Sequence, residues 1–358
     1  MSSTIAGPAA LALSSLSRSQ ISFIENLPKG ELHAHLNGCV PLSVLRHLAE
    51  SYEPDGDPSR PSLAQITAGL HTLESFDLDD IHGFFGAFRT IYALIATREA
   101  LATATRAVLS QFLDSPSPNE PPECVYLELR TTPRHTSTLS VEDYIDCVLS
   151  EVERYTPNQA ALILSLDRRM PLDGDDTAVT ISKVVAEAIR LKNDGRRVVG
   201  LDLCGDPLAG DMSLLEPYIA KAKTAGLGIT LHIAETLRNS PEETLQLLSY
   251  GPHRLGHATF LDEEAKAKVV KDKIGIEICL SSNLMQTVPT LSAHHITHYL
   301  EQNHPIAICT DDTLPFRNSL KGEYALLLAP PPVGLGVTEA QVEKIAQGSL
   351  DAAFSRSV

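Results

Sequence analysis

Residues 228–234 read GITLHIA, an almost unbroken apolar run that contains one histidine near its carboxyl end. Such a run is typical of a parallel β-strand that is buried on both faces. Segments with helical periodicity, such as 176–193 and 213–225, lie between this run and others like it. Seven further segments have the same strand character: 31–36, 125–131, 161–167, 198–203, 254–260, 275–280 and 305–310. Eight alternating rounds of strand and helix predict an α/β fold, a parallel sheet closed into a (β/α)8 TIM barrel.

The interval between the first two predicted strands is too long for one crossover helix, so we expect an insertion of several helices over residues 42–111. An insertion after the carboxyl end of a barrel strand can cover the active site. Two proline-rich stretches, 53–61 and 114–123, are predicted to be loops. Without an internal repeat or an interdomain linker, residues 21–358 are expected to form one domain. Residues 1–20 are expected to be a flexible leader, with a weak organellar signal as the alternative.

The chain of 358 residues holds 29 basic and 45 acidic residues, a formal net charge of −16 at pH 7. So negative a surface repels polyanions, and we expect no binding of nucleic acid or of a membrane. A few local arginines can still bind a small anion at short range. No apolar run approaches the ~18–20 residues of a membrane span. No heptad or extended apolar face indicates an obligate assembly, so we expect a monomer.

The six cysteines have no CxxC pair and no regular spacing. Most of them lie in or beside apolar runs, where cysteine behaves as a small hydrophobic residue. We therefore expect free thiols and a reduced, cytoplasmic protein.

Ionisable residues gather at the carboxyl ends of the predicted strands, where barrel enzymes build their active sites. His33 and His35 are two residues apart, so both side chains point to one face of their strand. Alone, such a pair is often an ordinary strand feature. With His232 and Asp311 at other strand ends, the set provides three nitrogens and one carboxylate, which suits a catalytic zinc ion with a position left for water.

Three further residues are candidates for acid–base chemistry at the same end of the barrel. Glu235 lies just past its strand, close enough to act as a general acid without ligating the metal; the alternative is a solvated loop carboxylate. His257 is a polar residue inside an apolar strand, and would otherwise be a hydrogen-bonded core histidine. Asp312 adjoins Asp311, and two buried neighbouring anions repel unless a cation offsets them.

Other metal chemistries fit the sequence less well. The chain has neither the HExxH of zinc proteases nor the PCxxC of cytidine deaminases. A dinuclear hydrolase with a carboxylated lysine would need a lysine after residues 198–203, where the sequence reads CGDP. We therefore expect one metal ion per chain.

With these residues in place, the sequence resembles the adenosine/AMP deaminase family from about Leu27 onward. The motifs that carry the resemblance occur in that family's order: LPKGELHAHLNG (27–38), VVGLDLCGDP (198–207), LHIAET (231–236), RLGHATFL (254–261), IEICLSSN (276–283) and ICTDD (308–312). The resemblance implies a barrel of the metal-dependent hydrolase type, with zinc held by His33, His35, His232 and Asp311. It further implies that Glu235 protonates purine N1, that His257 assists the attacking hydroxide and Asp312 orients it, and that Gly205 meets the purine edge.

Within the family, the likeness is greatest to the N6-methyl-AMP deaminases, through LELRTTPR (127–134), LDRR (166–169) and QTVP (286–289). The residues that this likeness implies for nucleotide binding, several of them around the 5′-phosphate, are His35, Asn37, Tyr92, Thr131, Thr132, Pro133, Arg134, Asp167, Gly205 and Asp312. Two positions depart from the family pattern: Gly30 replaces a usual Val, and Ala258 replaces a usual Gly.

The resemblance thus implies zinc-dependent hydrolysis of N6-methyl-AMP, and of related N6-substituted purine nucleoside monophosphates, to IMP and an amine. An arginine at position 134 suits a phosphate because its planar fork matches the phosphate oxygens. The alternative is that Arg130 and Arg134 form structural ion pairs. Two other functions stay open, an adenosine deaminase acting on the unphosphorylated nucleoside and a catalytically silent barrel that binds a purine nucleotide.

Overall fold

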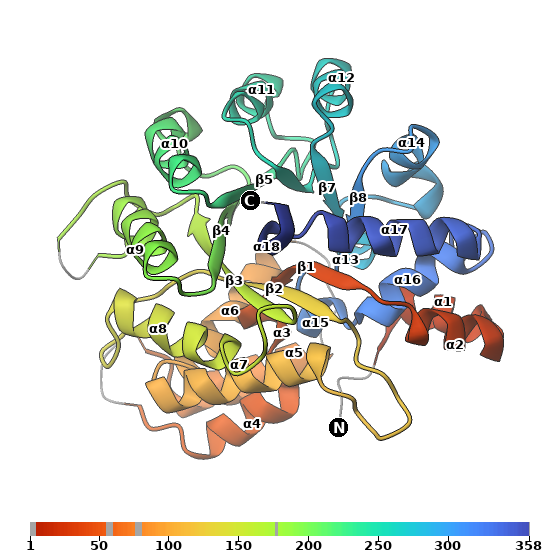
Figure 1. Cartoon of the computed structure of the whole chain (residues 1–358). Coiled ribbons are helices and arrows are strands. Elements are labelled where there is room, and N and C mark those ends of the chain that lie inside the picture. The colour runs from red at the N-terminus through yellow and green to blue at the C-terminus, as the bar shows by residue number, and fades with distance from the viewer. Residues whose placement is uncertain (1–4, 55–59, 76–80, 176–177, 358) are drawn as a thin grey trace.

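Eight parallel strands form one sheet whose order follows the chain from β1 to β8 (Figure 1). The computed structural model describes residues 5–54, 60–75, 81–175 and 178–357. The strands are β1 Gly30–His35, β2 Tyr126–Thr131, β3 Ala160–Asp167, β4 Val198–Cys204, β5 Gly228–Ile233, β6 Arg254–His257, β7 Gly275–Ile278 and β8 Ile306–Ile308. After β8 the chain pairs with β1: the backbone N–H of Asp311 donates to His33 O at 2.8 Å. The predicted (β/α)8 barrel is confirmed.

Helices separate successive strands, and most of them surround the sheet (Figure 1). Between β2 and β8 they are α8 Val141–Val152, α9 Ile181–Asn193, α10 Glu216–Thr224, α11 Pro241–Ser249, α12 Glu263–Asp272, α13 Leu280–Gln286 and α14 Ile296–Glu301. After β8 follow α15 Thr313–Phe316, α16 Leu320–Leu328, α17 Glu339–Asp351 and α18 Phe354–Ser357. Several of them start at a side-chain cap that the sequence supplies, such as Ser140 with Asp143 at α8 and Thr338 with Gln341 at α17. Of the helical segment predicted at 176–193, residues 176 and 177 lie outside the described residues.

Several helices occupy the long interval between β1 and β2, as predicted for residues 42–111. They are α3 Leu36–Cys39, α4 Leu42–Glu50, α5 Leu63–Ser75, α6 Ile81–Leu94 and α7 Arg98–Leu113. Residues 55–59 and 76–80 of that interval lie outside the described residues. Phe88 and Tyr92, on α6, line a cavity at the carboxyl ends of the strands. The insertion therefore contributes directly to the site described below.

Two strands end earlier than the apolar pattern predicts. The expected strand 254–260 stops at His257, because His257 and Ala258 adopt left-handed backbone conformations with φ of 58° and 50°. The expected strand 275–280 stops at Ile278, and α13 begins two residues later. A left-handed residue turns the chain out of the sheet. This turn places the His257 side chain at the strand's end.

The amino-terminal segment differs from the expected flexible leader over residues 1–20. Helix α1 (Gly7–Ser15) and the first residues of α2 (Arg18–Asn26) are ordered helices within it. Ala9 and Ala12 are fully buried, and a Cβ placed on Gly322 of α16 would lie 2.9 Å from the Ala9 side chain. Small residues let the two helices approach closely, so the alanine-rich stretch packs instead of remaining mobile. Residues 1–4 lie outside the described residues.

The remaining structural predictions concern cysteines and membrane spans. All six cysteines belong to the described residues, and each is a buried free thiol, as predicted. Within the described part of the chain, none of the helices combines the length and the apolar character that crossing a bilayer requires.

Candidate active site

Three histidines from β1 and β5 meet at the carboxyl end of the barrel. Nε2 of His35 lies 3.2 Å from Nε2 of His33 and 3.3 Å from Nε2 of His232. A carboxylate oxygen of Asp311 lies 3.8 Å from His33 Nε2 and 3.7 Å from His35 Nε2. The structure therefore brings together the four residues that the sequence predicts as metal ligands.

Buried carboxylates fix which ring nitrogens of two of these histidines carry the protons. Nδ1 of His33 lies 2.8 Å from Glu277 Oε2, and Nδ1 of His232 lies 3.0 Å from Asp202 Oδ1. An ionised carboxylate can only accept, so each Nδ1 donates, and in the neutral ring each Nε2 presents a lone pair. Two lone pairs aimed at one point repel unless a cation lies between them. Carboxylate partners of this kind are characteristic of metal-ligating histidines, so the arrangement fits a metal ion.

Both carboxylates are ionised because arginines compensate for their burial. Burial alone would raise the pKa of Asp202, but His232 and Arg130 outweigh it and bring the value to about 2. Burial acts in the same direction on Glu277, and Arg130 and Arg254 hold its pKa well below the usual range. Arg130 bridges the two carboxylates, with Nη1 3.2 Å from Asp202 Oδ1 and Nη2 on Glu277 Oε2. Arg130 is fully buried and ion-paired, which matches the structural alternative left open for it.

Sequence reasoning did not single out Asp202 and Glu277. The available signal was a charged residue in the middle of an apolar strand, in VVGLDLC and GIEIC. Ionised residues are rarely fully buried unless they are paired. A search for acids that interrupt buried strands, in addition to residues at strand ends, would have found both.

The residues proposed for acid–base chemistry lie around the same point. Nε2 of His257 is 3.9 Å from Glu235 Oε1 and 3.8 Å from Asp311 Oδ2. Glu235 follows β5 in a loop, as predicted, and its side chain is 16% exposed. Burial, reinforced by the charges of Asp311 and Glu235, raises the pKa of Asp312 well above its usual range. Oδ1 of Asp312 is buried without a hydrogen-bond partner in the described structure, so it is available to a ligand.

A cavity of about 120 Å³ opens above these groups. Its lining includes six of the residues predicted for metal binding or catalysis: His35, His232, Glu235, His257, Asp311 and Asp312. It also includes eight of the ten residues predicted to contact the nucleotide: His35 and Asp312 again, with Asn37, Tyr92, Thr131, Thr132, Asp167 and Gly205. His33 lies beneath the cavity, and Pro133 and Arg134 lie outside its lining.

Two glycines leave room for the carboxylates of the cavity. Gly205 has φ of 99°, and a Cβ at this position would lie 2.7 Å from Asp167 Oδ1. A Cβ on Gly38 would lie 1.7 Å from Asp312 Oδ1. A side chain at either position would displace the acid next to it. Both glycines belong to motifs that carry the family resemblance, LPKGELHAHLNG and VVGLDLCGDP.

The residues predicted around the phosphate form a second cluster at the edge of the cavity. The guanidinium carbon of Arg134 lies 3.4 Å from the centre of the Tyr92 ring. Thr131 Oγ1 is 2.9 Å from Tyr144 Oη, and Thr132 Oγ1 is 3.6 Å from Cys204 Sγ. A cation stacked on an aromatic ring keeps its N–H groups free at the ring's edge, so Arg134 can still donate to an anion.

Arg169 is a further cation that sequence reasoning did not assign to the site, although LDRR drew attention to it. Its side chain lines the cavity and forms an ion pair with Asp206. Its backbone N–H donates to Asp167 Oδ1 at 2.8 Å. Besides the buried Arg130, the structure thus places two arginines at the cavity: Arg169 in its lining, and Arg134 on the ring of Tyr92, which belongs to the lining.

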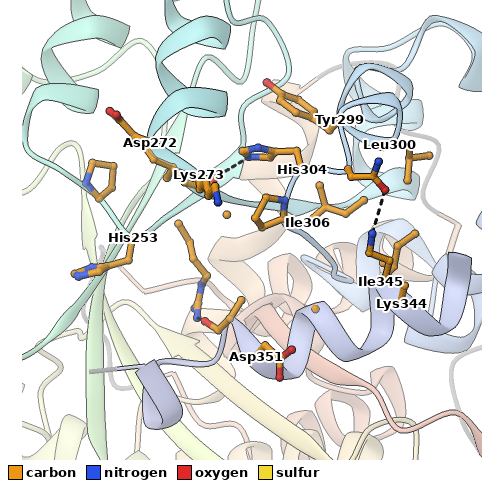
Figure 2. Close-up of a pocket in the computed structure, with 18 of the residues that line it drawn as sticks. His253, Asp272, Lys273, Tyr299, Leu300, His304, Ile306, Lys344, Ile345 and Asp351 are labelled. Atoms are coloured by element: carbon orange, nitrogen blue, oxygen red, sulfur yellow. Dashed lines mark hydrogen bonds between the residues drawn. The ribbon is translucent and has the colours of Figure 1, made fainter.

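A larger cavity, of about 670 Å³, lies at the opposite end of the barrel (Figure 2). The first residues of β6, β7 and β8 and several residues of α17 line it, with Lys273, His304 and Lys344 among the side chains drawn. Among the described residues, the groups of side chains arranged to hold a metal lie elsewhere, around His33 and Asp311. Because barrel enzymes carry out chemistry at the carboxyl ends of their strands, the smaller cavity is the candidate active site.

Comparison with known proteins yields matches over nearly the whole chain. The family model described as Adenosine deaminase matches residues 28–357. The N6-Methyl-AMP deaminase of Danio rerio is 32% identical over 346 residues, which cover 93% of this chain and 92% of that protein. A crystal structure of an Arabidopsis N6-mAMP deaminase matches with a TM-score of 0.79 and 31% identity, over 93% of this chain and 95% of that one. A structure of Arabidopsis ADAL complexed with IMP matches with a TM-score of 0.79 and 30% identity, over 93% of this chain and 94% of that one.

Proposed function

Because the chain belongs to the adenosine deaminase family, as its motifs predicted, we propose that it hydrolyses N6-methyl-AMP to IMP and methylamine. Membership of the family makes it a hydrolytic deaminase, and its relatives support a nucleotide as the class of substrate. The specific substrate is our inference. It rests on the relatives named N6-methyl-AMP deaminase and on the segment LELRTTPR, which lies at the edge of the cavity.

One observation carries the proposal: the nitrogens of three histidines and the carboxylate of Asp311 converge beneath a cavity that also contains Glu235, His257 and Asp312. We propose that His33, His35, His232 and Asp311 hold one zinc ion per chain. Bound zinc lowers the pKa of a water molecule to about 7, so that hydroxide is available at neutral pH.

The protein's own residues would supply the remaining steps. Glu235 would donate a proton to N1 of the purine, which lets the ring accept a nucleophile at C6. His257 and Asp312 would hold the attacking oxygen on one face of the ring. Gly205 would present its backbone to the purine edge, since the absence of a Cβ permits a close approach. The leaving nitrogen takes the hydrogen of the attacking oxygen as its bond to C6 breaks, so that neutral amine departs and the oxo group of IMP remains.

The phosphate would be bound at the edge of the cavity by Thr131, Thr132 and Arg134, with Asn37, Tyr92, Pro133 and Asp167 completing the nucleotide site. Arginine is suited to this role because its fork matches two phosphate oxygens. We further propose that the barrel, together with helix α1 packed against α16, acts as one domain and as a monomer.

A second candidate is deamination of the unphosphorylated nucleoside. The observation that favours it is the position of Arg134, which stacks on Tyr92 and lies outside the cavity lining. The test is to compare kcat/KM for N6-methyl-AMP, AMP, N6-methyladenosine and adenosine. A strong preference for N6-methyl-AMP supports the proposal, whereas a preference for adenosine overturns it. Zinc-loaded protein that releases no amine from any of the four would be a silent nucleotide-binding barrel.

A further inference from the structure

His257 is hydrogen-bonded to a group of side chains that do not line the cavity. Asn283, on α13, places its amide Nδ2 3.4 Å from His257 Nδ1 and 3.4 Å from Thr259 Oγ1. The amide Oδ1 of Asn283 lies 3.1 Å from Nε2 of His294. Nδ1 of His294 in turn lies 3.1 Å from the backbone nitrogen of Ile296, in the first turn of α14. These groups form a continuous chain of hydrogen bonds that ends at His257.

The direction of every bond in this chain of hydrogen bonds follows from its first member. The backbone N–H of Ile296 can only donate, so Nδ1 of His294 accepts and carries no proton. Burial lowers the pKa of His294 to about 3, so the ring is neutral and its proton is on Nε2. Nε2 therefore donates to Asn283, and the atom that it meets must be the amide oxygen.

With its oxygen turned towards His294, Asn283 turns its NH2 group towards His257 and Thr259. An amide N–H can only donate, so Nδ1 of His257 accepts and carries no proton. The proton of a neutral His257 ring is then on Nε2, the nitrogen that faces Glu235 and Asp311 at 3.9 and 3.8 Å. Both hydrogens of the Asn283 amide have acceptors, because the second one meets Thr259 Oγ1.

The backbone of His257 is held as well. Nε2 of His295 donates to the His257 carbonyl at 2.8 Å, and the rings of His294 and His295 stack with centroids 4.3 Å apart. His257 and Ala258 both adopt left-handed conformations, with φ of 58° and 50°, which L-residues rarely hold without support. Asn283, His294 and His295 thus fix both the nitrogen of the His257 ring that carries the proton and the backbone conformation that orients this ring.

We propose that Asn283, oriented by His294, is a positioning residue that keeps the proton of His257 on Nε2, so that His257 enters the reaction as a hydrogen-bond donor. What this inference means for catalysis rests on the proposed deamination. With a proton already on Nε2, this nitrogen can stabilise negative charge that develops on the attacking oxygen. It cannot at the same time take a proton from the attacking water.

The experiment reads the tautomer of His257 directly. The zinc-loaded protein is labelled with ¹⁵N in its histidines, and long-range ¹H–¹⁵N correlation spectra distinguish rings protonated on Nδ1 from rings protonated on Nε2. The signals of His257 are identified by their loss in His257→Gln. We expect His257 protonated on Nε2 in the unsubstituted protein. A ring protonated on Nδ1 would overturn the proposal.

Asn283→Asp is the matched variant, because it replaces only the NH2 group by an oxygen of similar size. The carboxylate still accepts from His294, but it can no longer donate to His257. We expect the proton of His257 to move to Nδ1 and kcat for N6-methyl-AMP to fall on the order of 10²-fold or more, as expected when a donor to developing negative charge is lost. KM should change little, since Asn283 lies outside the cavity lining. An unchanged tautomer and an unchanged kcat would refute the positioning role.

Thr259→Val serves as the control, because it removes the other acceptor of the Asn283 amide and leaves His294 in place. We expect His257 to keep its proton on Nε2 in this variant; a shift to Nδ1 would mean that His294 alone does not orient the amide. The two proposals also fail separately. If the unsubstituted protein deaminates no purine nucleotide, the proposed function is wrong, and the spectra still decide where the proton of His257 lies.

Discussion

Replacing Arg134 by alanine distinguishes a nucleotide deaminase from a nucleoside deaminase. The guanidinium carbon of Arg134 lies 3.4 Å above the centre of the Tyr92 ring, and Tyr92 lines the cavity. The side chain is therefore held at the cavity's edge while its N–H groups remain available. A hydrogen bond to a charged group contributes roughly 1.5–3 kcal/mol. At about 1.4 kcal/mol for each factor of ten, its loss predicts a fall on the order of ten- to a hundredfold in kcat/KM.

The assay compares kcat/KM for N6-methyl-AMP with kcat/KM for N6-methyladenosine in the unsubstituted protein and in Arg134→Ala. The fall should be larger for the nucleotide than for the nucleoside, because only the nucleotide has a phosphate for Arg134 to bind. The substitution also removes the stacking of Arg134 on Tyr92, roughly 0.5–2 kcal/mol, but that loss affects both substrates alike. Arg134→Lys should recover part of the preference, since lysine supplies the charge without the fork.

Arg169→Ala is the matched control, because Arg169 lines the same cavity and is ion-paired with Asp206. If Arg134 binds the phosphate, Arg169→Ala should affect the nucleotide less than Arg134→Ala does. Equal losses for nucleotide and nucleoside in Arg134→Ala would make Arg134 structural and refute the reasoning. A loss confined to the nucleotide in Arg169→Ala alone would move the phosphate site to Arg169.

Three other substitutions test the metal, the acid and a buried carboxyl. His232→Ala should lose most of its bound zinc and its activity, measured by metal analysis after dialysis; an active, metal-free preparation would contradict the proposed zinc site. Glu235→Gln should keep zinc and nucleotide binding while turnover falls on the order of 10²–10⁴-fold, and near-normal turnover would place the proton donor elsewhere. Burial raises the pKa of Glu323 from its ordinary 4.5 to about 7, so its protonated form favours the folded state and the free energy of unfolding should decrease as pH rises from 4.5 through 7. Glu323→Gln should reduce that decrease in urea unfolding at pH 5 and pH 8, and an identical pH dependence would exclude Glu323 as its source.

The barrel could be predicted from sequence because strands buried on both faces leave long apolar runs, and all eight runs became strands. Their ends were harder to predict. No local pattern shows that His257 and Ala258 adopt left-handed conformations, since the contacts that hold them come from His295, far along the chain. The amino-terminal sequence resembles a leader because its small apolar residues show little periodicity, whereas in the structure Ala9 and Ala12 are fully buried and Ala9 lies against Gly322 of α16.

The predicted metal ligands and acid–base residues shared one recognisable property, their position at strand ends. The residues that orient them do not share it. Asp202 and Glu277 lie within strands, and Asn283 and His294 belong to segments after β7. Each acts by touching a side chain distant in sequence, so its role becomes visible only when the fold brings the pair together. The reacting groups could therefore be predicted from the sequence, whereas the positions of their protons could be determined only from the structure.

The location of those protons separates three of the histidines of this site into two kinds. In His33 and His232, a carboxylate holds the proton on Nδ1, and Nε2 presents a lone pair to the shared point. In His257, an amide occupies the place of the carboxylate and donates to Nδ1, so Nε2 carries the proton. A ring of the first kind can ligate a cation, and a ring of the second kind can only donate to whatever the cation holds. At these three rings, the difference between a metal ligand and a hydrogen-bond donor thus follows from the group that contacts Nδ1, a carboxylate for His33 and His232 and an amide for His257.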